Sequence, residues 1–161
     1  MAKLSLVRID SRMIHGQVMT MWSKVDGINH ILAIDDGIAN DPFIQEIYSM
    51  AVPPALKATM LSVEDAAKRF KENTLPDDRF LVLFKDVGSA LRAWEAGFTF
   101  SSLQVGNLTP EQRTKILHKN SRLSVEHVPD LKKIQGYGVE VYAQSVPTEK
   151  KNMLDDLTKK I

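Results

Sequence analysis

The stretch Val7-Arg8-Ile9-Asp10-Ser11-Arg12-Met13-Ile14-His15-Gly16-Gln17-Val18 joins an apolar run to an amphipathic one. The apolar residues before it predict a buried strand over residues 3–9, and those after it repeat at helical spacing over about 15–25. A loop between a strand and a helix is a common ligand site, because the first N–H groups of the helix are unpaired and its dipole is positive there. Two arginines and a histidine in such a loop favour chemistry on a phosphate.

Strand and helix patterns alternate along the rest of the chain. Strands are expected over residues 31–34, 56–61, 80–84, 102–105, 123–125 and 139–143, the last at a sheet edge. Helices are expected from Pro42, Val63, Val87, Thr109, Val128 and Thr148, the fourth of them containing Ile116 and Leu117. This order predicts an α/β fold, a three-layer α/β/α sandwich with a mostly parallel sheet of about six or seven strands and the active loop after strand 1. We expect residues 1–161 to form a single domain, because no linker or composition break interrupts the pattern.

Composition excludes several classes of function. The chain has 161 residues, 43% of them hydrophobic and 25% charged, as in globular proteins. A net charge of +1 gives no electrostatic reason to expect nucleic acid as a partner. The absence of cysteine excludes disulfides, thiol nucleophiles and thiolate metal sites, and fits a reducing cytosol. No apolar run approaches the ~20 residues that cross a bilayer, and no leader sequence is visible, so no direct membrane insertion is expected.

Known cofactor motifs are missing as well. The sequence has neither a Gly-x-x-x-x-Gly-Lys-Ser/Thr loop nor a Gly-x-Gly-x-x-Gly loop, so we expect no nucleotide cofactor. His15 has no histidine or cysteine three or four residues away, so no metal site is expected there. The other histidines, His30, His118 and His127, are expected to be structural.

The loop residues suit phosphoryl transfer. A neutral imidazole at His15 is a good nucleophile toward phosphorus. Arg8 and Arg12 can hold the phosphoryl oxygens and the charge that develops during transfer, and Asp10 can orient an arginine or fix the ring tautomer. The backbone N–H groups that can point at the phosphate are those of Gly16, Gln17 and Val18. The alternative interpretation is that Arg8 and Asp10 form a surface ion pair and that Ser11 is only a helix cap.

Residues 8–18 resemble the signature loop of the IIB components of the mannose/fructose/sorbose class of the sugar phosphotransferase system (PTS). That loop usually reads Arg-Ile-Asp-(Asp/Ser/Glu)-Arg-Leu-Ile-His-Gly-Gln-Val, so Met13 stands where leucine is usual. Three more stretches are similar to family motifs: Asp36-Gly37-Ile38-Ala39-Asn40-Asp41, Val52-Pro53-Pro54 and Val105-Gly106-Asn107, the last followed by Leu108 instead of the usual methionine. The resemblance covers essentially the whole chain.

The resemblance implies a protein-Npi-phosphohistidine–sugar phosphotransferase. His15 would accept a phosphoryl group on Nδ1 from a phosphohistidine of a IIA protein and pass it to a sugar bound by the membrane subunits IIC and IID. Arg12 and Arg8 would stabilise the phosphate, Asp10 would support the loop, and no metal or cofactor would be needed. The candidate partner contacts at the rim are Met13, Ile14, Asp36, Phe84, Lys85 and Asn107. The implied location is cytoplasmic, peripherally associated with the membrane permease.

Two other functions remain open from the sequence. One is a non-catalytic module of the same fold that regulates a partner or binds a phosphorylated ligand. The other is a nucleotide or flavin binder that uses the same loop, against which the lack of a glycine run argues. The sugar cannot be read from this chain, and an edge strand at residues 139–143 leaves room for a homodimer.

Overall fold

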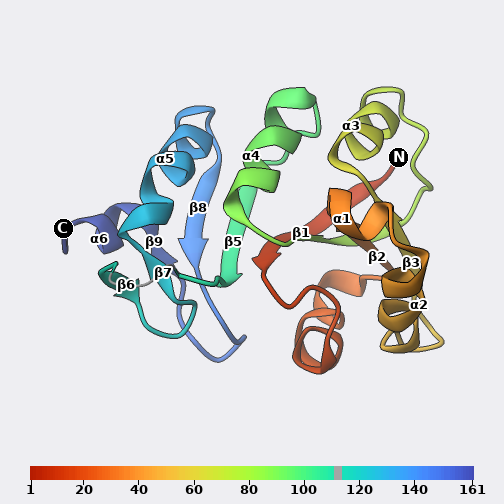
Figure 1. Cartoon of the computed structure of the whole chain (residues 1–161), viewed down its shortest axis with the longest axis horizontal. Coiled ribbons are helices and arrows are strands. Elements are labelled where there is room, and N and C mark those ends of the chain that lie inside the picture. The colour runs from red at the N-terminus through yellow and green to blue at the C-terminus, as the bar shows by residue number, and fades with distance from the viewer. Residues whose placement is uncertain (111–113) are drawn as a thin grey trace.

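A seven-stranded sheet with helices on both faces organises the computed structural model (Figure 1). The structure describes residues 1–110 and 114–161. In spatial order the strands are β3 (Lys57–Leu61), β2 (His30–Ile34), β4 (Arg79–Phe84), β1 (Lys3–Asp10), β5 (Ser102–Asn107), β8 (Glu140–Ala143) and β9 (Asn152–Met153). Neighbouring strands pair in parallel except β8 and β9, which are antiparallel. The expectation of a three-layer α/β fold with a mostly parallel sheet is confirmed.

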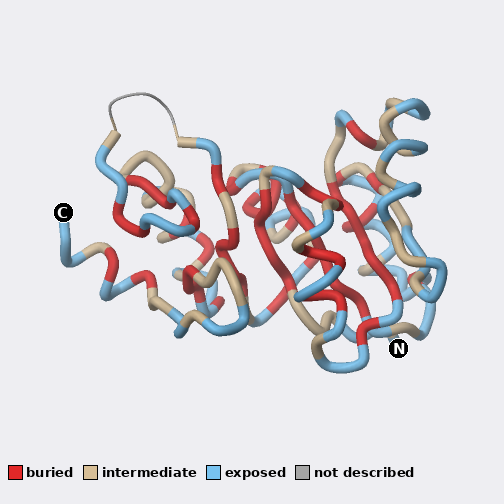
Figure 2. Tube along the Cα trace, turned by 90° about the horizontal axis from the view of Figure 1, so that it is seen from below, coloured by how far each residue is buried: buried red, intermediate tan, exposed pale blue. Residues whose placement is uncertain are grey.

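Helical segments cover both faces of the sheet. They are the π-helix η1 (Val18–Trp22), the 3₁₀ turns η2 (Val25–Gly27) and η3 (Val125–His127), and the helices α1 (Asp36–Ala39), α2 (Pro42–Met50), α3 (Val63–Lys71), α4 (Val87–Ala96), α5 (Val128–Gly136) and α6 (Leu154–Thr158). The buried apolar side chains form two clusters, one on each face. Helices α3 to α6 contribute to one cluster, and η1, α1 and partly buried residues of α2 to the other. The buried residues run along the strands between these layers (Figure 2).

Side-chain caps explain where several helices begin and end. Asp41 accepts hydrogen bonds from the N–H groups of Phe43 and Ile44, and Pro42 starts α2 directly after it. Ser62 caps α3 through the N–H of Asp65, 3.1 Å away. Both starts agree with the sequence. A left-handed glycine, Gly97 with φ of 113°, follows α4 as expected.

Four local expectations are wrong. The first helix is shorter than residues 15–25, because η1 ends at Trp22 with Ser23 as its C-cap, and a separate 3₁₀ turn follows at Val25–Gly27. Ile116–His118 form a strand, β6, antiparallel to β7 (Leu123–Ser124), because two adjacent apolar residues do not distinguish a helix from a strand. Residues 139–143 are not at an edge, since β9 pairs with β8, and the last helix starts only at Leu154. The expected helix start at residues 109–112 lies partly outside the described residues.

The topology places the end of β1 at a crevice. β1 lies between β4 and β5, and the chain leaves it toward η1, on one face of the sheet. After β5 the chain continues toward β6, β7 and α5, whose apolar residues pack on the other face. Where two such connections diverge from neighbouring parallel strands, the sheet has a ligand crevice at its carboxyl edge.

Candidate functional site

The loop after β1 is held by a tight turn and by the neighbouring strand. The turn closes with a hydrogen bond from the Met13 N–H to the Asp10 carbonyl, 3.0 Å, and Met13 itself has a positive φ of 59°. The Ser11 N–H donates to the Asn107 carbonyl at 2.9 Å, and the Asn107 Nδ2 donates to the Ser11 Oγ at 2.5 Å. The loop is therefore fastened to the end of β5, at the crevice.

Asp10 is the centre of the site and is fully buried. Its Oδ1 accepts hydrogen bonds from the backbone N–H of Arg12 at 3.0 Å and from Arg12 Nε at 3.1 Å. Its Oδ2 accepts from Arg12 Nη2 at 3.2 Å and from Arg8 Nη2 at 3.3 Å. Burial alone would raise the pKa of this carboxyl, but hydrogen bonds from His15 and Arg12 and the charge of Arg8 lower it to about 2. Asp10 is thus an anion at neutral pH.

His15 presents one ring nitrogen to Asp10 and keeps the other away from it. The distance from His15 Nε2 to Asp10 Oδ2 is 3.2 Å. An anionic acceptor at Nε2 selects the tautomer with the proton on that nitrogen, which leaves the lone pair on Nδ1. The His15 side chain is 19% exposed, so solvent and a partner can reach it. Its orientation is set by the contact with the buried Asp10 carboxylate.

Arg12 is the arginine at the surface of the site, with a side chain that is 43% exposed. Its Nη2 also donates to the Gln17 Oε1 at 2.8 Å, so the Gln17 side chain orients it. Among the described residues, the hydrogen-bond partners of Arg12 use Nε and Nη2, so the Nη1 donors remain for an anion. The sequence predicts only a backbone role for Gln17, and this side-chain contact with Arg12 was not foreseen.

Arg8 lies beneath the loop and is 0% exposed. Its Nη1 donates to the Gln104 Oε1 at 2.5 Å and to the Gln144 carbonyl at 3.0 Å, and its Nη2 donates to the Ser145 carbonyl at 3.1 Å. Burial lowers the pKa of Arg8, and the charge of Asp10 opposes that shift. The surface ion pair considered from the sequence is wrong. A buried guanidinium with these partners also does not fit direct contact with a phosphate on His15.

The amino end of the first helix lies directly after His15. Its first backbone hydrogen bond runs from the Met19 N–H to the His15 carbonyl, 3.0 Å. The N–H groups of Gly16, Gln17 and Val18 precede that bond and have no helical acceptor. An added Cβ on Gly16 would meet no atom within 4 Å, so this side of His15 is open. The Val18 side chain is buried in the core.

The candidate rim residues fall into three groups. Met13, Ile14 and Phe84 are buried in the core at 0%, 3% and 0% exposure, so their assignment as partner contacts is wrong. Asp36 is partly exposed and bonded elsewhere, to the Val63 N–H at 2.9 Å and to Arg92 at 3.2 Å.

Lys85 and Asn107 are at the crevice. Lys85 lines a hollow of about 210 Å³ together with Ser11, Asp86, Val87, Leu108, Thr109 and His127. This hollow adjoins the loop through Ser11. Lys85 thus lies at the rim, and its role as a partner contact stays a prediction. Asn107 holds the loop to the end of β5 through its hydrogen bonds with Ser11.

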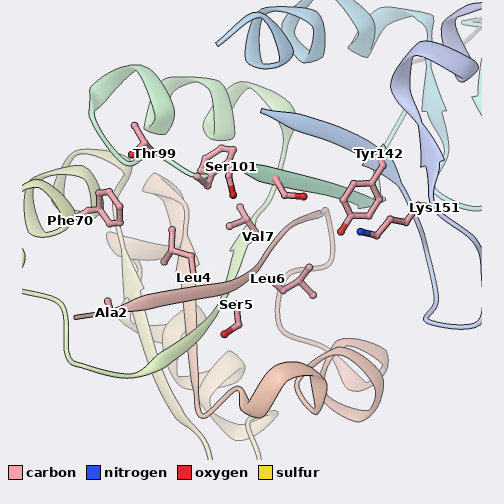
Figure 3. A pocket seen from close by; sticks show the side chains of 12 residues that line it. Ala2, Leu4, Ser5, Leu6, Val7, Phe70, Thr99, Ser101, Tyr142 and Lys151 are labelled. Carbon is pink, nitrogen blue, oxygen red and sulfur yellow. The ribbon is translucent and has the colours of Figure 1, made fainter. Parts of the chain in front are cut away.

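A second hollow, of about 420 Å³, lies beside the first half of β1 (Figure 3). It exists because β1 pairs with β5 only from Arg8 onward, so the two strands separate toward their amino ends. Residues such as Leu4, Ser101 and Tyr142 line it, and none of residues 8–17 does. This hollow is separate from the site around His15.

Two negative findings apply to the part of the chain that the structure describes. None of its helices has the length and apolarity needed to cross a membrane. In residues 1–110 and 114–161, no group of three or more His, Asp or Glu side chains is arranged to hold a metal ion.

Comparison with known proteins decides the family. The family model described as "PTS system sorbose subfamily IIB component" matches residues 4–161. The chain belongs to this family. The resemblance stated from the sequence is thereby confirmed.

Relatives and solved structures agree with this IIB assignment. The mannose-specific EIIAB component of Escherichia coli K12 is 29% identical over 161 residues, which cover 98% of this chain and 49% of that protein. This IIB chain thus spans about half the length of that relative. The sorbose-specific EIIB component of Klebsiella pneumoniae is 28% identical over 156 residues, 96% of this chain and 95% of that one.

Two crystal structures share the fold over nearly the whole length. The structure of manxB from Thermoanaerobacter tengcongensis has a TM-score of 0.90 and 34% identity, covering 99% of this chain and 97% of its own. The IIBSor domain of the sorbose permease from Klebsiella pneumoniae has a TM-score of 0.87 and 26% identity, with coverage of 98% and 97%.

Proposed function

We propose that this IIB chain is a phosphocarrier of a sugar PTS, with residues 1–161 acting as one domain. The observation that carries the proposal is the contact between Asp10 Oδ2 and His15 Nε2, which directs Nδ1 away from the carboxylate as the nucleophile. Family membership supports the same role, since relatives are named as IIB components for mannose, sorbose and fructose. These names differ in sugar, so the substrate of this chain stays open.

The proposed cycle has two balanced steps. In the first, Nδ1 of His15 attacks the phosphorus of a phosphohistidine on a IIA protein, so that an N–P bond forms here while the donor's N–P bond breaks. In the second, a sugar hydroxyl attacks the phosphorus, the His15 N–P bond breaks, and the hydroxyl proton passes to a base. With these two transfer steps, the proposed activity is that of a protein-Npi-phosphohistidine–sugar phosphotransferase.

The loop residues have distinct roles in this proposal. Arg12, with its free Nη1 donors, and the N–H groups of residues 16–18 hold the phosphoryl oxygens and the charge of the transition state. Asp10 fixes the ring and Arg8 fixes Asp10. The charge of Arg12 and the N–H dipoles of the amides take the stabilising role that metal ions have in kinases.

The proposed partners are a phosphorylated IIA protein as donor and membrane subunits IIC and IID, with bound sugar, as acceptor. The name EIIAB of the Escherichia coli relative joins a IIA and a IIB component in one protein, which supports a IIA donor. The Lys85 hollow beside Ser11 supports a contact at the rim of the crevice. We place the chain on the cytoplasmic side of the membrane, attached through these subunits.

Intact-mass measurement after incubation with phosphorylated IIA tests the proposal. The unchanged protein should gain one phosphate that is stable in base and lost in acid, and His15→Ala should gain none. His30→Gln, which changes a histidine at the amino end of β2 and so at the opposite edge of the sheet from the loop, serves as the control and should still be phosphorylated. Nuclear magnetic resonance of the phosphorylated ring should show phosphate on Nδ1. No phosphate with IIA proteins for any of the sugars named above would refute the carrier role.

A further inference from the structure

The segment of residues 144–149, between β8 and β9, closes on itself through Glu149. The Ser145 N–H donates to Glu149 Oε1 at 2.7 Å, and the Gln144 Nε2 donates to the Glu149 backbone carbonyl at 2.7 Å. The Glu149 side chain is 15% exposed. Glu149, at one end of this six-residue segment, thus binds the two residues at the other end, although it belongs to none of the motifs quoted above for the family.

The inner side of this segment touches the floor of the His15 site. The Gln144 carbonyl accepts from Arg8 Nη1 at 3.0 Å, and the Ser145 carbonyl accepts from Arg8 Nη2 at 3.1 Å. The Ser145 carbonyl also accepts from Trp22 Nε1 at 3.2 Å, and the Trp22 ring lies 5.0 Å from the Arg8 guanidinium carbon. Arg8 therefore has two of its acceptors on the segment that Glu149 closes.

The second carboxylate oxygen of Glu149, Oε2, also has hydrogen-bond partners. This oxygen lies 2.9 Å from His118 Nε2 and accepts from Asn120 Nδ2 at 2.9 Å. The Ser121 N–H donates to His118 Nδ1 at 3.2 Å, so in the neutral ring the proton is on Nε2 and points at Glu149. His118 is 8% exposed, and Asn152 Nδ2 lies 3.3 Å from its Nε2. These contacts give the carboxylate a donor on each oxygen.

We propose that Glu149 is a positioning residue for His15. It holds residues 144–149 in the conformation that presents two carbonyls to Arg8, Arg8 then holds Asp10, and Asp10 sets the ring orientation and tautomer of His15. The consequence for phosphoryl transfer rests on the function proposed above, whereas the consequence for the His15 ring does not.

The physical reason is the burial of Arg8. A guanidinium with no exposed surface cannot replace a lost protein acceptor by water, and an unpaired buried donor is costly. If the two carbonyls move away, the freed Nη1 and Nη2 donors compete for Asp10 Oδ2, the oxygen that faces His15 Nε2. The Asp10 carboxylate then no longer fixes the ring in one orientation.

Glu149→Gln is a sharp test, because both carboxylate oxygens accept hydrogen bonds and an amide has only one oxygen. Whichever way the amide is turned, its NH2 group faces a donor, either the Ser145 N–H or His118 and Asn120. The matched control is Glu140→Gln on β8, a side chain that is 51% exposed and 3.9 Å from Lys151. Nitrogen-15 spectra of the His15 ring report the tautomer without any partner. Phosphoramidate, a small-molecule phosphoryl donor, and phosphorylated IIA report the reaction rate.

In Glu149→Gln, we expect the His15 ring to populate both neutral tautomers. Phosphorylation by both donors should be about tenfold slower, because the nucleophilic nitrogen is no longer held in position. Glu140→Gln should match the unchanged protein in all readouts. A single Nε2–H tautomer and an unchanged phosphoramidate rate in Glu149→Gln would overturn the inference. If Glu149→Gln does not fold, Glu149→Asp, which is one methylene too short to span both sides, is measured in the same way. If phosphorylated IIA does not react even with the unchanged protein, the carrier proposal fails, and the ring spectra still decide the role of Glu149.

Discussion

Replacing Gly106 by alanine is expected to destabilise the fold by about 3–5 kcal/mol, because it breaks hydrogen bonds of a buried charged group that contribute about 1.5–3 kcal/mol each. Gly106 has no positive φ, so alanine fits its backbone, and on that ground alone the change would stabilise by about 0.4–1 kcal/mol. Arg8 reverses the sign of this expected change in stability. A Cβ at Gly106 would lie 2.5 Å from Arg8 Nε and closer still to Cζ and Nη2.

The size of the effect follows from how firmly Arg8 is held. Carbon atoms in contact need about 3.5 Å, so the guanidinium would have to move by more than about 1 Å. Its hydrogen bonds to Gln104, Gln144 and Ser145 are 2.5, 3.0 and 3.1 Å long, and a shift of that size breaks several of them. No water can replace them, because the side chain is 0% exposed.

Urea unfolding and thermal melting test this prediction. At about 2–4 °C per kcal/mol for a chain of this size, the melting temperature should fall by roughly 10 °C. Gly136→Ala is the matched control, since a Cβ there meets nothing within 4 Å, and it should be neutral or slightly stabilising. A Gly106→Ala protein as stable as Gly136→Ala would show that Arg8 relocates freely, and would refute the fixed-network reasoning.

Two further predictions concern Asp10 and Arg12. The folded pKa of Asp10 is about 2, below its ordinary 3.8, so its contribution of roughly 2 kcal/mol is complete above about pH 4 and is lost as the pH falls through 2. Urea unfolding from pH 2 to 6 should show this loss in the unchanged protein and not in Asp10→Asn; equal pH dependence in both would contradict it. Arg12→Ala should slow phosphoryl transfer by about 10²-fold or more, as for other transition-state donors, yet change stability by less than about 1 kcal/mol, because the side chain is 43% exposed. A loss of stability large enough to explain the loss of rate would argue against a direct role for Arg12.

The strands and helix caps could be predicted because their signals are local. The apolar run at residues 80–84, the Asp41–Pro42 start and the Gly97 stop each act through neighbours in the chain. Local signals failed where the partner was distant. Residues 139–143 resemble an edge strand, but β9, which begins nine residues after Ala143, pairs with them. Likewise Ile116–His118 became a strand only because Leu123–Ser124 pairs with it.

The candidate site shows the same division. The roles of Asp10 and His15 follow from a motif within one loop, and the structure brings them together. The floor of the site could not be foreseen, because it depends on strand order. Arg8 pairs directly with Gln104 in the β1–β5 register, and the β8–β9 turn supplies two carbonyls. One signal was present in the sequence: Gln104 is a polar residue between Leu103 and Val105 in a buried strand, and buried polar groups require a partner.

The two arginines have different tasks, and their charges explain why. Arg8 and Asp10 are both fully buried and offset each other, so Arg12 is the cation of the loop that faces solvent. On the function proposed here, the phosphoryl group brings close to two negative charges, which one exposed arginine and neutral amides do not fully compensate. A carrier must release the group it accepts, and binding the phosphorylated state too tightly would raise the barrier of the second step. Because Arg8 is buried and paired with Asp10, it stabilises the conformation of the loop. It does so without placing a second positive charge next to the phosphoryl group.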